Sequence, residues 1–118
     1  MSKGREAAVE RIRHMFQAAE AIGRYVERGR AAFDHDSAIR EAIVYQIAVM
    51  GEAAKAVVAA DPSLGAEIPE IEWSLLAKMR DKVTHQYWAV DAELVWSTAE
   101  HVVPEIKALL TKALDRLQ

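Results

Sequence analysis

The sequence of 118 residues contains no cysteine, only three prolines and five glycines, and no long hydrophobic run. The absence of cysteine excludes disulfides, zinc–thiolate sites, iron–sulfur clusters and thiol nucleophiles. It also fits a reducing compartment, so we expect a cytoplasmic protein. No apolar stretch approaches the roughly 18 residues of a membrane span. The first residues lack an apolar segment after their charges, so neither a membrane span nor a secretory signal is expected.

The chain also lacks an excess of positive charge, with 15 Lys and Arg against 18 Asp and Glu and a net charge of −3. This balance excludes a globally basic surface for nucleic acid but still allows a local basic patch. A chain of this length is expected to form one domain, residues 1–118, with a core of its own. Scarce Gly and Pro beside abundant Ala, Glu, Arg and Leu favour an all-helical domain.

Apolar residues repeat at helical spacing in four segments, of which the first two are long. The first spans about residues 5–27 and stops before Gly29. The second begins at the N-cap candidates 34–37 and ends at residues 61–62, where Asp-Pro breaks the helix. The apolar stripes comprise Val9, Ile12, Phe16, Ala19, Gly23 and Val26 in the first segment, and Ile39, Ile43, Ile47, Met50, Ala54 and Val57 in the second.

The other two helices come after a connector at residues 61–72, which we expect to lie over the core as a loop. The third helix is predicted from near Trp73 to about Tyr87. The fourth begins after Asp91, and its stripe continues through Pro104, which predicts one long, kinked helix. This stripe comprises Val95, Ala99, Val102, Ile106, Leu109, Ala113 and Leu117. The sequence thus predicts an all-α, antiparallel four-helix up-and-down bundle, with five helices as the alternative count.

The candidate site lies at the end of the third helix, where Arg80, His85 and Tyr87 fall within eight residues. On a continuous helix Arg80 and Tyr87 share nearly the same face, whereas Arg80 and His85 diverge by roughly 140°. On such a helix Arg80 and His85 cannot both contact one small chemical group. Either the helix unwinds near His85, or a second chain completes the site. Asp81 precedes His85 by four residues, and a carboxylate there would raise the pKa of the imidazole and fix its tautomer.

These residue types suit cleavage of RNA without a metal ion. Such cleavage needs a base for the 2′-hydroxyl, an acid for the leaving 5′-oxygen and a cation for the phosphate. Arg80 suits the role of the cation through its bidentate fork. His85, whose ordinary pKa lies near neutrality, suits either proton transfer. A homodimer with the motif at its interface would supply two histidines and two arginines, which solves both the angular problem and the lack of a second histidine.

Each of these residues also has an ordinary structural explanation. A lone arginine on a helix is usually a surface residue, a histidine near a helix C-terminus complements the helix dipole, and Tyr87 could be a packing aromatic. The other histidines lack metal-ligand spacing, and neither His-Glu-x-x-His nor a di-iron type Glu-x-x-His pair occurs. No metal and no cofactor is therefore expected.

The spacing from Arg80 through His85 to Tyr87 resembles the R-x-x-x-x-H-x-Y motif of HEPN-domain ribonucleases, and most closely that of the HepT toxin family. Residues 51–55, Gly-Glu-Ala-Ala-Lys, resemble the G-E-A-x-K segment of the same family. The resemblance covers about residues 43–110 and includes Ile68, Pro69, Trp73, Val90, Asp91, Val95, Trp96 and Pro104. It implies a HEPN-like helical bundle that dimerises, with the two motifs meeting in a cleft between protomers.

The resemblance also implies a metal-independent endoribonuclease that serves as the toxin of a type II toxin–antitoxin pair. Arg80 and His85 match the catalytic residues of the family, and Asp81 occupies the polar position after the arginine. The cognate antitoxin would be a small MntA-like nucleotidyltransferase that transfers AMP from ATP to the motif tyrosine, here Tyr87. Phosphates added there would lie beside Arg80. Glu52 either braces Arg80 after a close helix approach at the preceding glycine, or is an ordinary exposed glutamate.

Two other functions are compatible with the same residues. The chain could be a non-catalytic helical subunit that binds a nucleotidyltransferase, or a protein that binds nucleotides or nucleic acid through Lys78, Arg80 and Lys82 without cleaving them. Growth arrest on expression of the chain alone would separate the toxin from a harmless adaptor.

Overall fold

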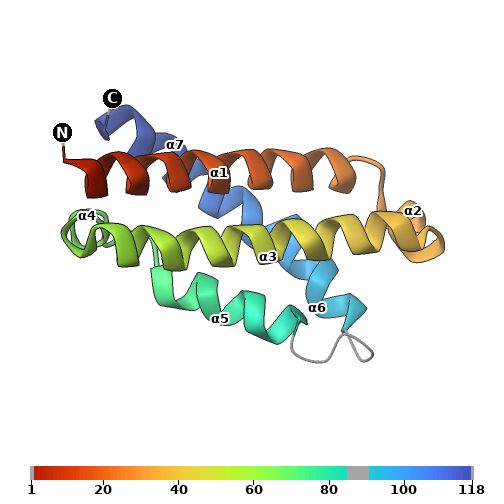
Figure 1. The fold of residues 1–118 in the computed structure, drawn as a ribbon. Helices are drawn as coiled ribbons and strands as arrows, with labels where there is room; N and C mark the ends of the chain where they lie inside the picture. The colour runs from red at the N-terminus through yellow and green to blue at the C-terminus, as the bar shows by residue number, and fades with distance from the viewer. Residues whose placement is uncertain (1, 85–90, 118) are drawn as a thin grey trace.

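The computed structural model describes residues 2–117 except 85–90, and within these residues it contains helices and no strand. Four long helical stretches form a bundle: α1 (Lys3–Val26), α3 (Ser37–Ala60), α5 (Trp73–Thr84) and a C-terminal stretch made of α6 (Ala92–Ser97), the π-helical turn η2 (Thr98–Val102) and α7 (Val103–Leu117). The short helices α2 (Arg30–His35) and α4 (Pro62–Glu67) lie in the connections. Figure 1 shows α1 and α3 side by side, α5 along α3, and the C-terminal stretch returning toward the N-terminus. The predicted all-α fold is confirmed.

The long helices begin where the sequence offers capping side chains. Ser2 before α1, Asp36 before α3 and Asp91 before α6 each accept a hydrogen bond from a backbone N–H two or three residues later. These bonds satisfy N–H groups that the first turn of a helix leaves without a partner. Asp36 lies among the predicted N-cap candidates, and Asp91 is the predicted cap of the last helical stretch.

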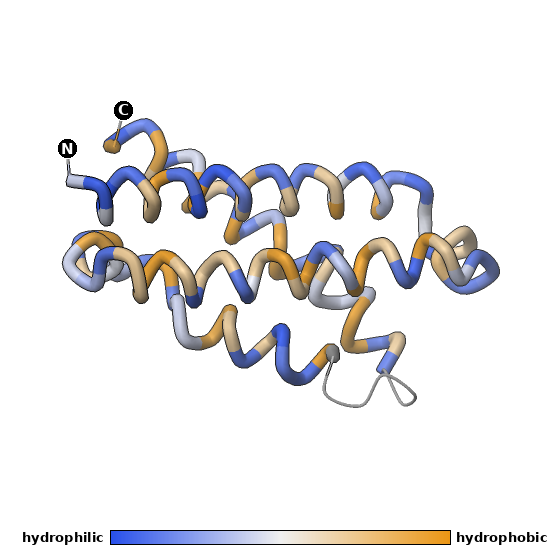
Figure 2. The backbone as a smooth tube through the Cα atoms, in the orientation of Figure 1, coloured by the Kyte–Doolittle hydropathy of each residue, from blue (hydrophilic) through white to orange (hydrophobic). Residues whose placement is uncertain are grey.

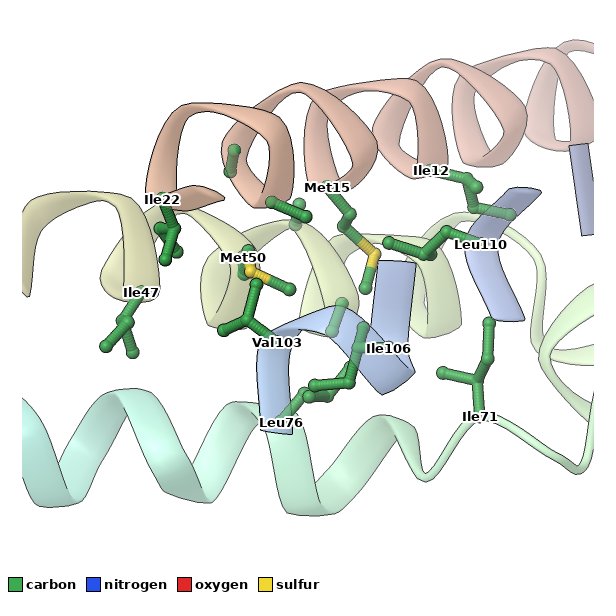
Figure 3. Close-up of a cluster of buried hydrophobic side chains, with 14 of the residues drawn as sticks. Ile12, Met15, Ile22, Ile47, Met50, Ile71, Leu76, Val103, Ile106 and Leu110 are labelled. Carbon is green, nitrogen blue, oxygen red and sulfur yellow. The ribbon is translucent and has the colours of Figure 1, made fainter. Parts of the chain in front are cut away.

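One apolar core lies between the long helices, and Figure 3 shows its side chains pointing toward one another from α1, α3, α5 and α7. The whole stripe predicted for α3 is buried. In α1 the buried face differs in part: Met15 and Ile22 are fully buried, whereas Gly23 is exposed and Phe16 is half-buried. Because α1 packs against both α3 and α7, it buries a broader face than one stripe. Hydrophobic and hydrophilic residues alternate along α1 in Figure 2, as expected of an amphipathic helix.

The C-terminal stretch is one continuous helical run, and η2 shows how it accommodates Pro104. The N–H of Val103 bonds to the carbonyl five residues earlier, which is the π-helical pattern. A wider turn there suits a proline, which lacks an N–H and clashes with the preceding turn of a regular helix. The extra residue in the turn also rotates the helix beyond it. Ile106 and Ala113 are buried as predicted, whereas Val103 and Leu110 are buried where the sequence predicted Val102 and Leu109.

The connector between α3 and α5 contains α4, which corrects the expectation of a loop. Asp61 caps this helix by accepting hydrogen bonds from the backbone N–H groups of Ser63 and Leu64, and Pro62 occupies the first helical position. This pairing is typical of a helix start. The Ser63 hydroxyl and these backbone bonds hold the pKa of Asp61 below its usual value. The connector still covers the core, because its apolar residues Leu64, Ile68 and Ile71 are buried.

The connection between α1 and α3 contains α2, a second helix that the sequence did not predict. It begins after Gly29, whose φ of 91° is one that glycine tolerates. Phe33 is fully buried and packs against Trp96 of α6, with ring centroids 5.1 Å apart. Arg30 contacts Glu93 of α6 and thereby lowers the pKa of that carboxyl. Aromatic packing and an ion pair thus attach α2 to α6.

Among the described residues, α3 is the one helix that is long and apolar enough to cross a membrane by length and composition alone. This differs from the expectation that no segment would reach that length. In the structure α3 is the central helix and packs against both α1 and α5. Contact with two neighbours accounts for its apolar composition, since a helix buried on several sides carries few polar residues.

Candidate functional site

Arg80 lies on α5 where that helix packs directly against α3. A Cβ atom added at Gly51 of α3 would lie 2.3 Å from Cβ of Arg80 and 2.9 Å from the carbonyl oxygen of Leu76. Only glycine lets the two helices approach this closely. The close helix approach expected at Gly51 is confirmed, and it sets the position from which the side chain of Arg80 extends.

Two carboxylates hold the guanidinium of Arg80. Oε1 of Glu52 lies 3.1 Å from Nη2, and Oδ1 of Asp81 lies 2.9 Å from Nη1. Glu52 belongs to α3 and Asp81 to α5, so the guanidinium is oriented from both helices. Charge-assisted contacts at exposed side chains contribute little to stability but favour one geometry. The side chain of Arg80 is 38% exposed, so an anion in solvent can reach it.

This arrangement agrees with the interpretation in which Glu52 braces Arg80, rather than with an unengaged surface glutamate. Asp81, which the sequence places within reach of His85, has Arg80 as its described partner. The predicted residues His85 and Tyr87 lie outside the described residues. The structure therefore brings Arg80, Asp81 and Glu52 together.

A groove of about 400 Å³ lies between α3 and α5 and contains residues of both sequence motifs. Gly51, Glu52 and Lys55 line it from α3, and Arg80 and Asp81 line it from α5. The G-E-A-x-K segment and the start of the arginine motif thus form one surface. Lys55 adds a second cation, which was not a predicted site residue. Its position in the same short motif as Glu52 was the available signal.

The groove places two cations, Arg80 and Lys55, beside two carboxylates, Glu52 and Asp81. An oriented guanidinium recognises phosphate through its fork, and Lys55 is a flexible point charge beside it. Lys78 and Lys82 are also present on α5, but residues two positions from Arg80 point to the other side of the helix, and neither lysine lines the groove. Within residues 2–84 and 91–117, no group of three or more His, Asp or Glu side chains is placed to hold a metal ion.

Comparison with known proteins gives several matches. The family described as "Ribonuclease HepT-like" matches residues 15–113. Two proteins of Methanocaldococcus jannaschii, each named "Putative RNase", are 37% identical over 86 residues, which is 73% of this chain and 72% and 69% of theirs. A protein of Thermococcus cleftensis named "Probable ribonuclease HepT" is 32% identical over 77 residues, which is 65% of this chain and 67% of its own. No solved structure matches.

Proposed function

The chain belongs to the HepT-like ribonuclease family, and from that premise we propose that it is a metal-independent endoribonuclease that acts as the toxin of a type II toxin–antitoxin pair. One observation carries the proposal, namely that the side chain of Arg80 is held at both ends. The close helix approach at Gly51 sets the position of its Cβ atom, and Glu52 and Asp81 orient its guanidinium. A cation held in place before the substrate arrives is what stabilises charge developing on a phosphate. In this proposal Arg80 and His85 are catalytic, and Asp81 positions Arg80.

The proposed reaction is an internal transfer at one phosphate of RNA. A base takes the proton of the 2′-hydroxyl, and the 2′-oxygen forms a bond to the adjacent phosphorus. The bond from phosphorus to the 5′-oxygen breaks, and an acid protonates that oxygen. The products carry a 2′,3′-cyclic phosphate and a 5′-hydroxyl. His85 serves the proton transfers, and Arg80 neutralises the charge that builds up on the phosphate oxygens.

We assign the second histidine to a second copy of the chain, so that the active cleft is shared by a homodimer. The exposed apolar residues near α5 support this assignment. Leu75 of α5 is 55% exposed, and Val102 of η2, across a groove of about 260 Å³, is 40% exposed. Exposed apolar side chains on and next to the helix that carries Arg80 are typical of surfaces that a protein partner covers. A two-fold axis near α5 would place two copies of the motif close together.

We also propose that a cognate MntA-like nucleotidyltransferase neutralises the toxin in the cytoplasm. The phenolic oxygen of Tyr87 would form a bond to the α-phosphorus of ATP, and pyrophosphate would leave. The AMP group adds negative charge a few residues from Arg80, where it would compete with the phosphate of the substrate. Tyr87→Phe should gain no mass when it is mixed with the partner and ATP.

The decisive experiment incubates the purified chain with total RNA in EDTA, with wild type beside His85→Ala. His101→Ala is the matched control, because His101 is 70% exposed on η2 and does not line the groove at Arg80. All three proteins should first show equal helicity, equal oligomeric mass and no AMP by intact mass. We expect cleavage by wild type and His101→Ala only. An unmodified wild-type protein that leaves RNA intact would instead favour the non-catalytic subunit of a nucleotidyltransferase complex.

A further inference from the structure

A second groove adjoins Arg80 on the other side of α3. It has a volume of about 460 Å³ and lies between α1 and α3. Arg11 and His14 line it from α1, Tyr45 and Glu52 from α3, and Arg80 from α5. Glu52 and Arg80 line both grooves, so this surface, the α1–α3 groove, is continuous with the candidate site. Its volume lies within the range of about 300–1,000 Å³ that is typical of small-ligand sites.

Tyr45 is the most prominent feature of the α1–α3 groove. Its side chain is 65% exposed, the highest value among the large apolar residues described. The ring therefore takes little part in the core and presents a face to solvent. Tyr45 precedes Glu52 by two helical turns, about 10 Å along the helix axis. An aromatic face thus lies roughly one to two nucleotide lengths from the residue that holds Arg80.

The charges around the α1–α3 groove favour an anion. Among the described residues, no carboxylate lies within 4.0 Å of the guanidinium of Arg11. The neighbouring Glu10 is instead engaged by Arg13 at 2.9 Å and by His14 at 3.4 Å. Glu52 is the carboxylate that lines the groove, and it pairs with Arg80. Glu52 and Asp81 both pair with Arg80, so Arg11 is the cation that the α1–α3 groove offers to an anion.

We propose that the α1–α3 groove binds single-stranded RNA beside the phosphate that is cut. A base stacks on Tyr45, Arg11 binds a backbone phosphate, and His14 offers a hydrogen bond to the base or ribose. Aromatic faces and guanidinium groups are the features that recognise unpaired bases and their backbone. This inference rests on the proposed ribonuclease function and adds a substrate-binding subsite to it. A protein partner is the less favoured occupant, because an arginine and a histidine line the same groove as the ring.

The test measures binding and cleavage of a single-stranded RNA oligonucleotide of twelve uridines. Binding is measured by fluorescence anisotropy in the His85→Ala background, and kcat and KM are measured with His85 intact. Tyr45→Ala should weaken binding by about 5- to 160-fold, the range for the loss of one stacked base. Tyr45→Phe keeps the ring and should bind within about two-fold of wild type. Arg11→Ala should lower the slope of log affinity against log salt by about 0.7. The matched control is Arg24→Ala, an exposed arginine on α1 outside the groove.

The outcomes separate this inference from the function on which it rests. Higher KM with nearly unchanged kcat in Tyr45→Ala, and restored KM in Tyr45→Phe, would support the subsite. Full activity and affinity in Tyr45→Ala would overturn the subsite while leaving the ribonuclease intact. A loss of oligomeric mass in Tyr45→Ala would assign the groove to contact between copies and overturn the proposal. A wild type that neither binds nor cleaves RNA would overturn both the function and the subsite.

Discussion

Replacing Gly51 by alanine tests how the candidate site is built. The added Cβ would lie 2.3 Å from Cβ of Arg80 and 2.9 Å from the carbonyl oxygen of Leu76. Carbon atoms in contact lie about 3.5–4.0 Å apart, so α3 and α5 must separate by roughly 1 Å or more at this point. Neither obstacle can rotate away, because one is a backbone atom and the other is fixed to the backbone. The substitution should therefore move the base of Arg80 itself.

The change in the free energy of unfolding of Gly51→Ala depends on two opposing contributions. Alanine is favoured over glycine inside a helix by about 1 kcal/mol. Overpacking at a closed contact costs about 1–3 kcal/mol. Gly51→Ala should thus change the free energy of unfolding by between about zero and −2 kcal/mol, so the protein remains folded. A displacement of about 1 Å in an active-site group can cost about 100-fold in rate, so activity should fall much further than stability.

Gly23→Ala is the matched control, because a Cβ at Gly23 would meet no atom within 4 Å. That variant should gain the helix propensity of alanine and keep full activity. The difference in stability between the two alanine variants, measured by urea unfolding, isolates the overpacking and should be about 1–3 kcal/mol. In ribonuclease assays, the rate of RNA cleavage should fall by about 100-fold in Gly51→Ala and should not change in Gly23→Ala. Equal stability and equal activity in the two variants would refute the argument that glycine is needed for the approach of α5.

Three further predictions concern an ion pair, a pH dependence and the core. Glu52→Gln keeps the shape of the side chain but removes the charge that faces Arg80, so kcat should fall several-fold with stability unchanged within about 0.5 kcal/mol; equal kcat would show that the carboxylate does not orient Arg80. Arg30 lowers the pKa of Glu93, so the ion pair stabilises the fold at pH values above the usual pKa of a glutamate. This stabilisation is lost as the pH falls through the lowered pKa of Glu93. Glu93→Gln should therefore be less stable than wild type at pH 7 but lose less stability on acidification, as urea unfolding at several pH values will show. Leu110→Ala removes a fully buried side chain and should cost about 2–5 kcal/mol in the same assay, whereas a loss below about 1 kcal/mol would contradict the described core.

The long helices could be predicted because local features specify them. Caps such as Asp36 and Asp91 and the regular stripe of α3 are visible in the residues themselves. The stripe of the last helical stretch correctly placed Ile106 and Ala113 in the core, but it shows only the average spacing and so missed Val103 and Leu110. The helix α4 was missed although Asp61 and Pro62 mark a helix start, because the same pair also ends α3. Burial of α2 depends on Phe33 meeting Trp96, a contact between distant segments.

The site was predictable in part for the same reason. The spacing of Arg80 and Asp81 and the resemblance of their motif lie within one short segment. The contact of Glu52 with Arg80 depends on how α3 packs on α5, which the apolar pattern leaves open. The unusual glycine inside a helix was the signal for a close approach, but it could not show which helix approaches. No feature of the sequence of α1 indicated that this helix lines a groove beside Arg80.

The order of Gly51 and Glu52 explains how two adjacent residues can control one arginine. Successive residues on a helix point about 100° apart, so when Gly51 faces α5, Glu52 is turned toward the flank of the contact. Gly51 is buried and Glu52 is exposed, as this geometry requires. The backbone of α5 therefore rests on the glycine, while the long side chain of Arg80 leaves the contact and meets the carboxylate at its edge. The glycine sets the origin of the side chain and the glutamate sets its direction. Exchanging the two residues would place a carboxylate inside the helix contact and leave the guanidinium unguided, although composition and net charge would be unchanged.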